Sequence, residues 1–258
     1  MVIRVIEQQN YNKNGFILAE GLFNPEELEE VHEVVTRFHE LWLKDNAKFY
    51  EEKAINSAYL TNKKYLSDEQ RMVLFKLLSS EKIDQLVRRV IPKSPVFMNT
   101  QLFFNPKTAG QKNYWHRDTQ YHMTLEQQQE ALKGPEVLHI RVALKDEPGI
   151  EVIPASHVCW DTKEELLIRL EHDEHKSHED LSAGVKIPMK VGDVLLFSAN
   201  MIHRGLYGLD RFSLDLLYFE SDAEILKFVE QDCLPNDKEM EELKYPPVFV
   251  NALSKSES

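Results

Sequence analysis

The chain has 258 residues, with 31 Lys and Arg against 43 Asp and Glu, which gives a formal net charge of −12 at pH 7. This acidic balance argues against a protein that binds the phosphates of nucleic acid or an anionic membrane, because both kinds of binding need a basic surface. No glycine-rich Rossmann or P-loop fingerprint occurs, and no apolar run approaches the length of a membrane span. The two cysteines, Cys159 and Cys233, cannot form a disulfide framework. Because the first residues also lack a signal-peptide pattern, we expect a cytoplasmic protein with reduced thiols.

Helical signals dominate the first third of the chain. The segment Asn24 to Glu27 combines a capping residue, a proline at the first helical position and an acidic third position, which predicts a helix start. Apolar residues then recur every three or four positions between Leu28 and Trp42, as on one face of a helix. A second capping box begins at Ser67, and further helical stretches are predicted after Thr124, Asp161 and Asp222.

From about residue 96 the pattern changes to short segments rich in β-formers. Many short strands with turns between them, after a helical block, are typical of a β-barrel or jelly roll with helices packed outside. Pro188 within one of these segments indicates an edge strand or a bulge. The predicted strands are Val96–Phe104, Leu138–Leu144, Ile150–Ile153, Val185–Val191, Val194–Phe197 and Arg211–Phe219.

Two histidines and an aspartate form a candidate metal site. In a strand, residues i and i+2 point to the same face, so His116 and Asp118 would present an imidazole and a carboxylate side by side. His203 follows just past the strand that ends at Phe197. Two histidines and one carboxylate on one face of a metal leave its other positions open, as in non-haem Fe(II) oxygenases. The alternative is a strand-end histidine that only hydrogen-bonds to its neighbouring aspartate.

Arg211 and Ser213 are a candidate anion site, because they would share a face of the last strand. Arginine offers a planar fork that matches a carboxylate, and a nearby hydroxyl can add a third hydrogen bond. Taken alone, Arg211 could equally be a surface or ion-paired arginine. The order of the signals strengthens the functional interpretation: His-x-Asp, a long β-rich interval, a histidine and then an arginine.

Taken together, these patterns make the sequence resemble the phytanoyl-CoA dioxygenase family of Fe(II)- and 2-oxoglutarate-dependent oxygenases. The resemblance covers roughly residues 11 to 219 and rests on local patterns that occur in the family's order. These are Asn14–Gly21 as the opening strand, Asn105–Lys107 with Trp115–Asp118, Val142–Asp146 with Ile153–His157, Gly192–Phe197, and His203–Gly205 with Arg211–Ser213.

The resemblance implies an α+β fold, namely a double-stranded β-helix (jelly-roll, cupin-like) core with N-terminal and inserted helices packed outside. It also implies one domain over residues 1–258, with a mainly helical part (1–95), the β-helix core (96–219), and a C-terminal helix and tail (220–258).

The resemblance further implies a set of site residues. His116, Asp118 and His203 would hold Fe(II), and O2 and the keto-acid end of 2-oxoglutarate would take its open positions. Arg211 with Ser213 would hold the distal carboxylate of 2-oxoglutarate, and Gln101 would face the same cosubstrate. The reaction would hydroxylate a C–H bond and release succinate and carbon dioxide. Members that halogenate replace the carboxylate ligand with a small residue, so the retained aspartate favours hydroxylation.

The sequence departs from the family at Ala155, where the family's Pro-Gly-Ser-His segment has glycine, and in the short preceding loop 147–151. These departures bear on substrate handling. Arg141 lies in an apolar strand, and its role stays open: it could bind an anionic group of the substrate, or it could be an outward arginine or one paired with a core carboxylate. We expect a small-molecule substrate, with small acids and amino acids ahead of CoA esters, because no basic cradle for the CoA phosphates is apparent. No partner nucleic acid or membrane is expected, and the oligomeric state stays open.

Two alternative functions and one competing metal site stay open. The alternatives are a nucleic-acid demethylase of the same barrel class, which the charge of −12 disfavours, and a non-catalytic cupin-type binding barrel, which has no need of an arginine for 2-oxoglutarate. The competing site is the histidine-rich segment with His172, His175 and His178, which could be a lid or collect stray metal; we favour a solvated acidic loop.

Overall fold

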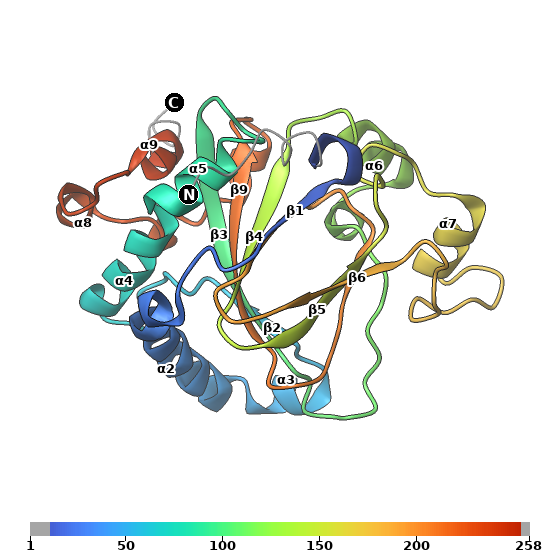
Figure 1. The fold of residues 1–258 in the computed structure, drawn as a ribbon, viewed down its shortest axis with the longest axis horizontal. Coiled ribbons are helices and arrows are strands. Elements are labelled where there is room, and N and C mark those ends of the chain that lie inside the picture. Colours follow the sequence, from blue (N-terminus) through green and yellow to red (C-terminus); the bar gives the residue numbers. More distant parts are fainter. Residues whose placement is uncertain (1–10, 254–258) are drawn as a thin grey trace.

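The computed structural model describes residues 11–253 and contains two antiparallel sheets (Figure 1). The larger sheet has six strands in the order β1-β7-β4-β9-β3-β2, and the smaller has three in the order β6-β5-β8. Their bounds are β1 Phe16–Ala19, β2 Asn56–Ala58, β3 Pro95–Phe104, β4 Val137–Ala143, β5 Glu147–Val152, β6 Val185–Met189, β7 Val194–Ser198, β8 His203–Gly205 and β9 Phe212–Glu220.

The two faces of the larger sheet have different roles, because side chains alternate along each strand. In β4, Leu138, Ile140 and Val142 pack into the main hydrophobic core with the helices that cover the outer face. The residues between them, His139 and Arg141, face the interior between the sheets. Apolar residues from β4, β5, β6 and β7 form a second, smaller buried cluster. The inner face of β4 is therefore free to carry polar groups.

Helices α2, α4 and α5 lie along the outer face of the larger sheet, on the left in Figure 1. The capping boxes at Ser67 and Thr124 begin α4 and α6 as predicted. The helical stretch predicted after Asp161 is α7, for which Thr162 is the cap. The helix bounds are α2 Glu29–Asp45, α3 Ala47–Glu52, α4 Asp68–Leu78, α5 Glu81–Val87, α6 Leu125–Ala131, α7 Lys163–Arg169, α8 Asp237–Glu241 and α9 Pro247–Leu253, with 3-10 turns η1 Pro25–Leu28, η2 Asp118–Tyr121, η3 Ile225–Phe228 and η4 Gln231–Cys233.

The predicted α+β double-stranded β-helix with helices outside is confirmed, and one local prediction is wrong. The segment at His116 is not a strand: it makes a single bridge with His203, and Asp118 begins the 3-10 turn η2. The helical stretch predicted after Asp222 is the short 3-10 helix η3, and α8 and α9 follow it. Pro188 does lie in an edge strand, β6. Within residues 11–253, no helix has both the length and the hydropathy that crossing a membrane requires.

Candidate metal centre

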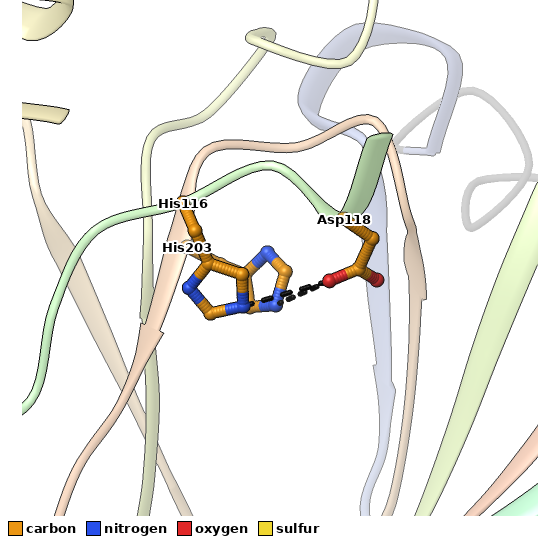
Figure 2. A group of neighbouring side chains, drawn as sticks. All are labelled: His116, Asp118 and His203. Carbon is orange, nitrogen blue, oxygen red and sulfur yellow. Dashed lines mark ion pairs between the residues drawn. The ribbon is translucent and has the colours of Figure 1, made fainter. Parts of the chain in front are cut away.

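Three side chains from two distant segments point at one another in the interior (Figure 2). His116 and His203 exchange both backbone hydrogen bonds at 2.9 Å, which brings their imidazole centroids to 4.2 Å. Asp118 Oδ1 lies 3.5 Å from His116 Nε2 and 3.8 Å from His203 Nε2. One ligand atom from each residue falls within 4.8 Å of the others, and no other trio of His, Cys, Asp or Glu in residues 11–253 does so.

A buried arginine explains why a two-residue step still places His116 and Asp118 on one side. The intervening Arg117 is fully buried and points the other way, where it donates to the backbone carbonyls of Ser156 and Asn200. It also pairs with the buried carboxylate of Asp161 at 2.8 Å, and Arg169 pairs with the same carboxylate at 2.7 Å. This Arg117–Asp161–Arg169 network anchors the segment in place of the expected strand.

The backbone sets the tautomer of both histidines. His116 Nδ1 lies 3.2 Å from the Tyr114 carbonyl oxygen and His203 Nδ1 lies 3.0 Å from that of Met201. A carbonyl can only accept, so each Nδ1 carries a proton, and Nε2 is the atom of each ring that faces Asp118 and would bind a metal. Burial, followed by the neighbouring His116, lowers the pKa of His203 to about 3. The imidazole of His203 is therefore neutral near pH 7, which is the form that binds a metal.

The second oxygen of Asp118 is held by a residue that the sequence did not single out. His139 Nε2 lies 2.7 Å from Asp118 Oδ2, and His139 Nδ1 lies 3.1 Å from Asp215 Oδ2. Burial opposes a charge on this ring, but the carboxylates of Asp118 and Asp215 raise the pKa of His139 to about 9. With both nitrogens donating, His139 occupies Oδ2 and leaves Oδ1 facing the two imidazoles.

Arg141 continues this chain of contacts. Its Nε and Nη2 donate to the two oxygens of Asp215 at 2.7 and 2.9 Å, so the pairing with a core carboxylate, expected as one of its alternatives, is present. Its remaining nitrogen, Nη1, is buried without a partner among the described residues, and the side chain lines the interior cavity. Substrate binding and carboxylate pairing are thus both compatible with the position of Arg141, whereas an outward arginine is not, because the residue is buried.

Arg211 is the least satisfied cation in the described structure. It is 2% exposed, and none of its three guanidinium nitrogens makes a hydrogen bond to the described residues. The nearest carboxylate, Glu147, lies 3.4 Å from Arg211 Nε without hydrogen-bond geometry. The hydroxyl of Ser213, also fully buried, is likewise unpartnered among residues 11–253. Buried polar groups normally have partners, so this arrangement is suited to a ligand that brings its own acceptors.

One cavity of about 1110 Å³ joins the two sites. Its wall includes the three converging residues as well as Arg211, Arg141 and Gln101, whereas Ser213 does not line it. Gly205 faces Arg211 at close range: a methyl group there would come within 2.9 Å of Arg211 Nη1. The missing side chain leaves room for a group bound at the guanidinium.

Comparison with known proteins shows which family has this fold and site. The family model of phytanoyl-CoA dioxygenase (PhyH) matches residues 11–206. The chain belongs to the phytanoyl-CoA dioxygenase family. Members are Fe(II)- and 2-oxoglutarate-dependent dioxygenases that use O2, so the enzyme class and the cofactors predicted from the sequence are confirmed.

Solved structures share the fold of this PhyH-family chain at low identity. AviO1 from Streptomyces viridochromogenes Tue57 is 17% identical with a TM-score of 0.57, over 86% of this chain and 97% of that one. EctD from S. alaskensis with 2-oxoglutarate and 5-hydroxyectoine is 15% identical with a TM-score of 0.59, over 96% and 83%. The carbocyclase SnoK from nogalamycin biosynthesis is 14% identical with a TM-score of 0.55, over 86% and 85%. A search of curated proteins finds no match.

The competing histidine-rich segment does not assemble in this PhyH-family structure. His172, His175 and His178 do not converge as a metal group, and His175 instead pairs with Glu179 at 2.8 Å. The segment is a largely exposed loop that is tied to the barrel by the indole N–H of Trp115, which donates to the Glu179 carbonyl at 2.8 Å.

Proposed function

We propose that the protein hydroxylates a C–H bond of a small organic molecule and that His116, Asp118 and His203 hold its Fe(II). The balanced reaction is R–H + 2-oxoglutarate + O2 → R–OH + succinate + CO2. The observation that carries the proposal is that the converging trio and the unpartnered Arg211 line the same cavity.

The donor set fits the metal. Two imidazole nitrogens and one carboxylate oxygen point toward one another, and this set suits ferrous iron with open positions for other ligands. Bound iron would supply the oxidising chemistry, using O2 and 2-oxoglutarate. His139 would keep the ligating carboxylate oriented, as outer residues do at other metal sites.

The anion site fits a diacid. Arg211 would bind the distal carboxylate through its fork, with Ser213 nearby in the chain and Gln101 on the neighbouring strand facing the cosubstrate. Arg141 would offer its free Nη1 to an acceptor on a bound molecule, which we assign to the substrate. The surrounding sheets would exclude water from the reaction.

Fold neighbours show that this barrel hosts more than one outcome. EctD is described with 5-hydroxyectoine, whereas SnoK is described as a carbocyclase and SnoN as an epimerase. Because Asp118 is retained as the carboxylate of the trio, we favour hydroxylation over halogenation, and we take hydroxylation as the reaction to test first. We further propose that the whole chain works as one domain, and that it works in the cytoplasm, supported by the unpaired Cys159 and Cys233.

Isotopic labelling tests the proposal. Under 18O2, with Fe(II) and 2-oxoglutarate, succinate should gain one labelled oxygen, and a hydroxylated product should gain the other. His116→Ala should abolish succinate formation, and His175→Ala in the exposed loop should not. A wild-type protein that binds iron but never forms succinate under any condition would instead support the cupin-type binding barrel.

A further inference from the structure

The cavity extends well beyond the metal and anion sites. Its volume of about 1110 Å³ exceeds the 300–1000 Å³ typical of pockets for drug-sized ligands. Four large apolar side chains line it and are nevertheless exposed: Tyr59 (42%), Tyr121 (53%), Met123 (38%) and Phe228 (52%). Exposed apolar groups gathered in this way mark binding surfaces. A free amino acid would leave most of this surface in water.

The part of the cavity wall away from the metal and anion sites, here called the outer wall, is acidic. Apart from the residues of the metal and anion sites, its charged side chains are four carboxylates and Lys227, which pairs with Glu224 at 2.6 Å. The carboxylates come from α6 and from the segment before η3, and the neighbouring parts of the chain meet where the rings of His122, just before α6, and Phe228, at the end of η3, lie 5.7 Å apart. The four carboxylates are Glu126, Glu130, Asp222 and Glu224.

An anionic substrate would find no free cation on this outer wall within the described residues. The inner arginines offer an anion no unbalanced charge, because Asp215 balances Arg141 and the cosubstrate would occupy Arg211, so the free Nη1 of Arg141 would serve a neutral acceptor on the substrate. A cation, in contrast, would meet the carboxylates and the ring of Phe228, and aromatic rings attract cations.

We infer that the substrate is a bulky, largely apolar molecule that carries a positive charge, such as an arylalkyl amine or a quaternary ammonium compound. This inference rests on the proposed function for the identity of the inner cavity. The charged group would sit near Glu126 and Asp222 at the mouth, and the apolar body would extend inward. The oxidised C–H bond would therefore belong to the apolar end, remote from the nitrogen.

Three matched probes test the charge preference: 2-(naphthalen-2-yl)ethyltrimethylammonium, its uncharged tert-butyl isostere, and 3-(naphthalen-2-yl)propanoate. Each is titrated calorimetrically, without oxygen, into protein loaded with Fe(II) and saturating 2-oxoglutarate, so that Arg211 is occupied. The cation should bind about tenfold more tightly than the isostere at low salt, with a smaller gap at high salt. Equal affinities, or tightest binding of the propanoate, would overturn the inference.

Two pairs of variants locate the effect. Glu126 and Glu164 occupy the same position in the first turn of capped helices, and both are exposed, but only Glu126 lines the cavity. Glu126→Gln should weaken the cation about two- to fivefold and leave the isostere unchanged, and Glu164→Gln should change neither. Phe228→Ala should weaken both probes, and Tyr245→Ala, an exposed aromatic outside the cavity, should not. Identical behaviour of the two glutamine variants would also refute the inference.

The complex of Fe(II) and 2-oxoglutarate in such a site has a weak charge-transfer band in the visible region. This band tests the proposed function separately from the inferred substrate class. A normal band with the wrong probe ranking would refute the substrate class and leave the oxygenase assignment intact. If no band forms, the proposed function fails, and the cation–isostere comparison is still made on metal-free protein, where the same ranking is expected.

Discussion

Removing His139 should weaken metal binding although His139 is not one of the three converging residues. In His139→Phe, a ring of similar shape fills the space between β4 and β7, but Asp118 Oδ2 loses the donor now 2.7 Å away. A hydrogen bond to a charged group contributes about 1.5–3 kcal/mol. At 1.36 kcal/mol per factor of ten, this converts to about 10- to 100-fold weaker Fe(II) binding, the range found for outer partners of metal ligands.

Anaerobic calorimetric titration with Fe(II) measures this effect directly. His139→Gln, which keeps one donor, should lie between wild type and His139→Phe. His39→Phe is the matched control, because it replaces a partly buried imidazole in the aromatic cluster under α2, away from the metal residues. If His139→Phe binds Fe(II) as tightly as the wild type, the role assigned to the Asp118–His139 contact is wrong.

Three further predictions follow from the contacts. Gly205→Ala should raise the 2-oxoglutarate dissociation constant about tenfold and leave the Fe(II) affinity unchanged, because the added methyl group would crowd Arg211. Gly110→Ala, where the added methyl group meets open space, is the control. An unaltered dissociation constant in Gly205→Ala would contradict the assigned anion site. Asp161→Asn should lower the free energy of unfolding, measured by urea denaturation, by about 3–5 kcal/mol, because two buried arginines lose their shared carboxylate. A loss below about 1 kcal/mol would show that the fold does not depend on this network. Burial lowers the pKa of His39 to about 4, so the unfolded chain binds more protons than the folded protein between pH 6.5 and 4, and the free energy of unfolding falls as the pH drops through that window. His39→Phe should flatten this dependence of stability on pH in acid denaturation. An unchanged slope would refute the role of His39 in acid sensitivity.

The sequence could predict the parts of the site that depend on local pattern. His116 and Asp118 are two residues apart, and the order of His203 and Arg211 after a β-rich interval needs no knowledge of packing. The predicted local conformation at His116 was nevertheless wrong, since a fully buried arginine network and a single bridge replace the strand there. The arginine network and the bridge, rather than strand geometry, place His116 and Asp118 side by side.

The residues behind the ligands could not be predicted in the same way. His139 and Asp215 meet only because β4 and β9 pair in a register that places His139 opposite Leu217 and Arg141 opposite Asp215. A one-residue slip would send these side chains to the outer core, and nothing in either segment alone specifies the register. The one available signal was the presence of His139 and Arg141 at alternate positions in an otherwise apolar strand.

Anaerobic addition of Fe(II) and then 2-oxoglutarate, followed in the visible region, tests the central claim most directly. The account predicts a weak charge-transfer band with wild-type protein, no band with His116→Ala, and a band that needs far more 2-oxoglutarate with Arg211→Met. A wild-type protein that takes up iron yet gives no band, or a His116→Ala variant that keeps it, would contradict the assignment of this cavity as an iron and 2-oxoglutarate site.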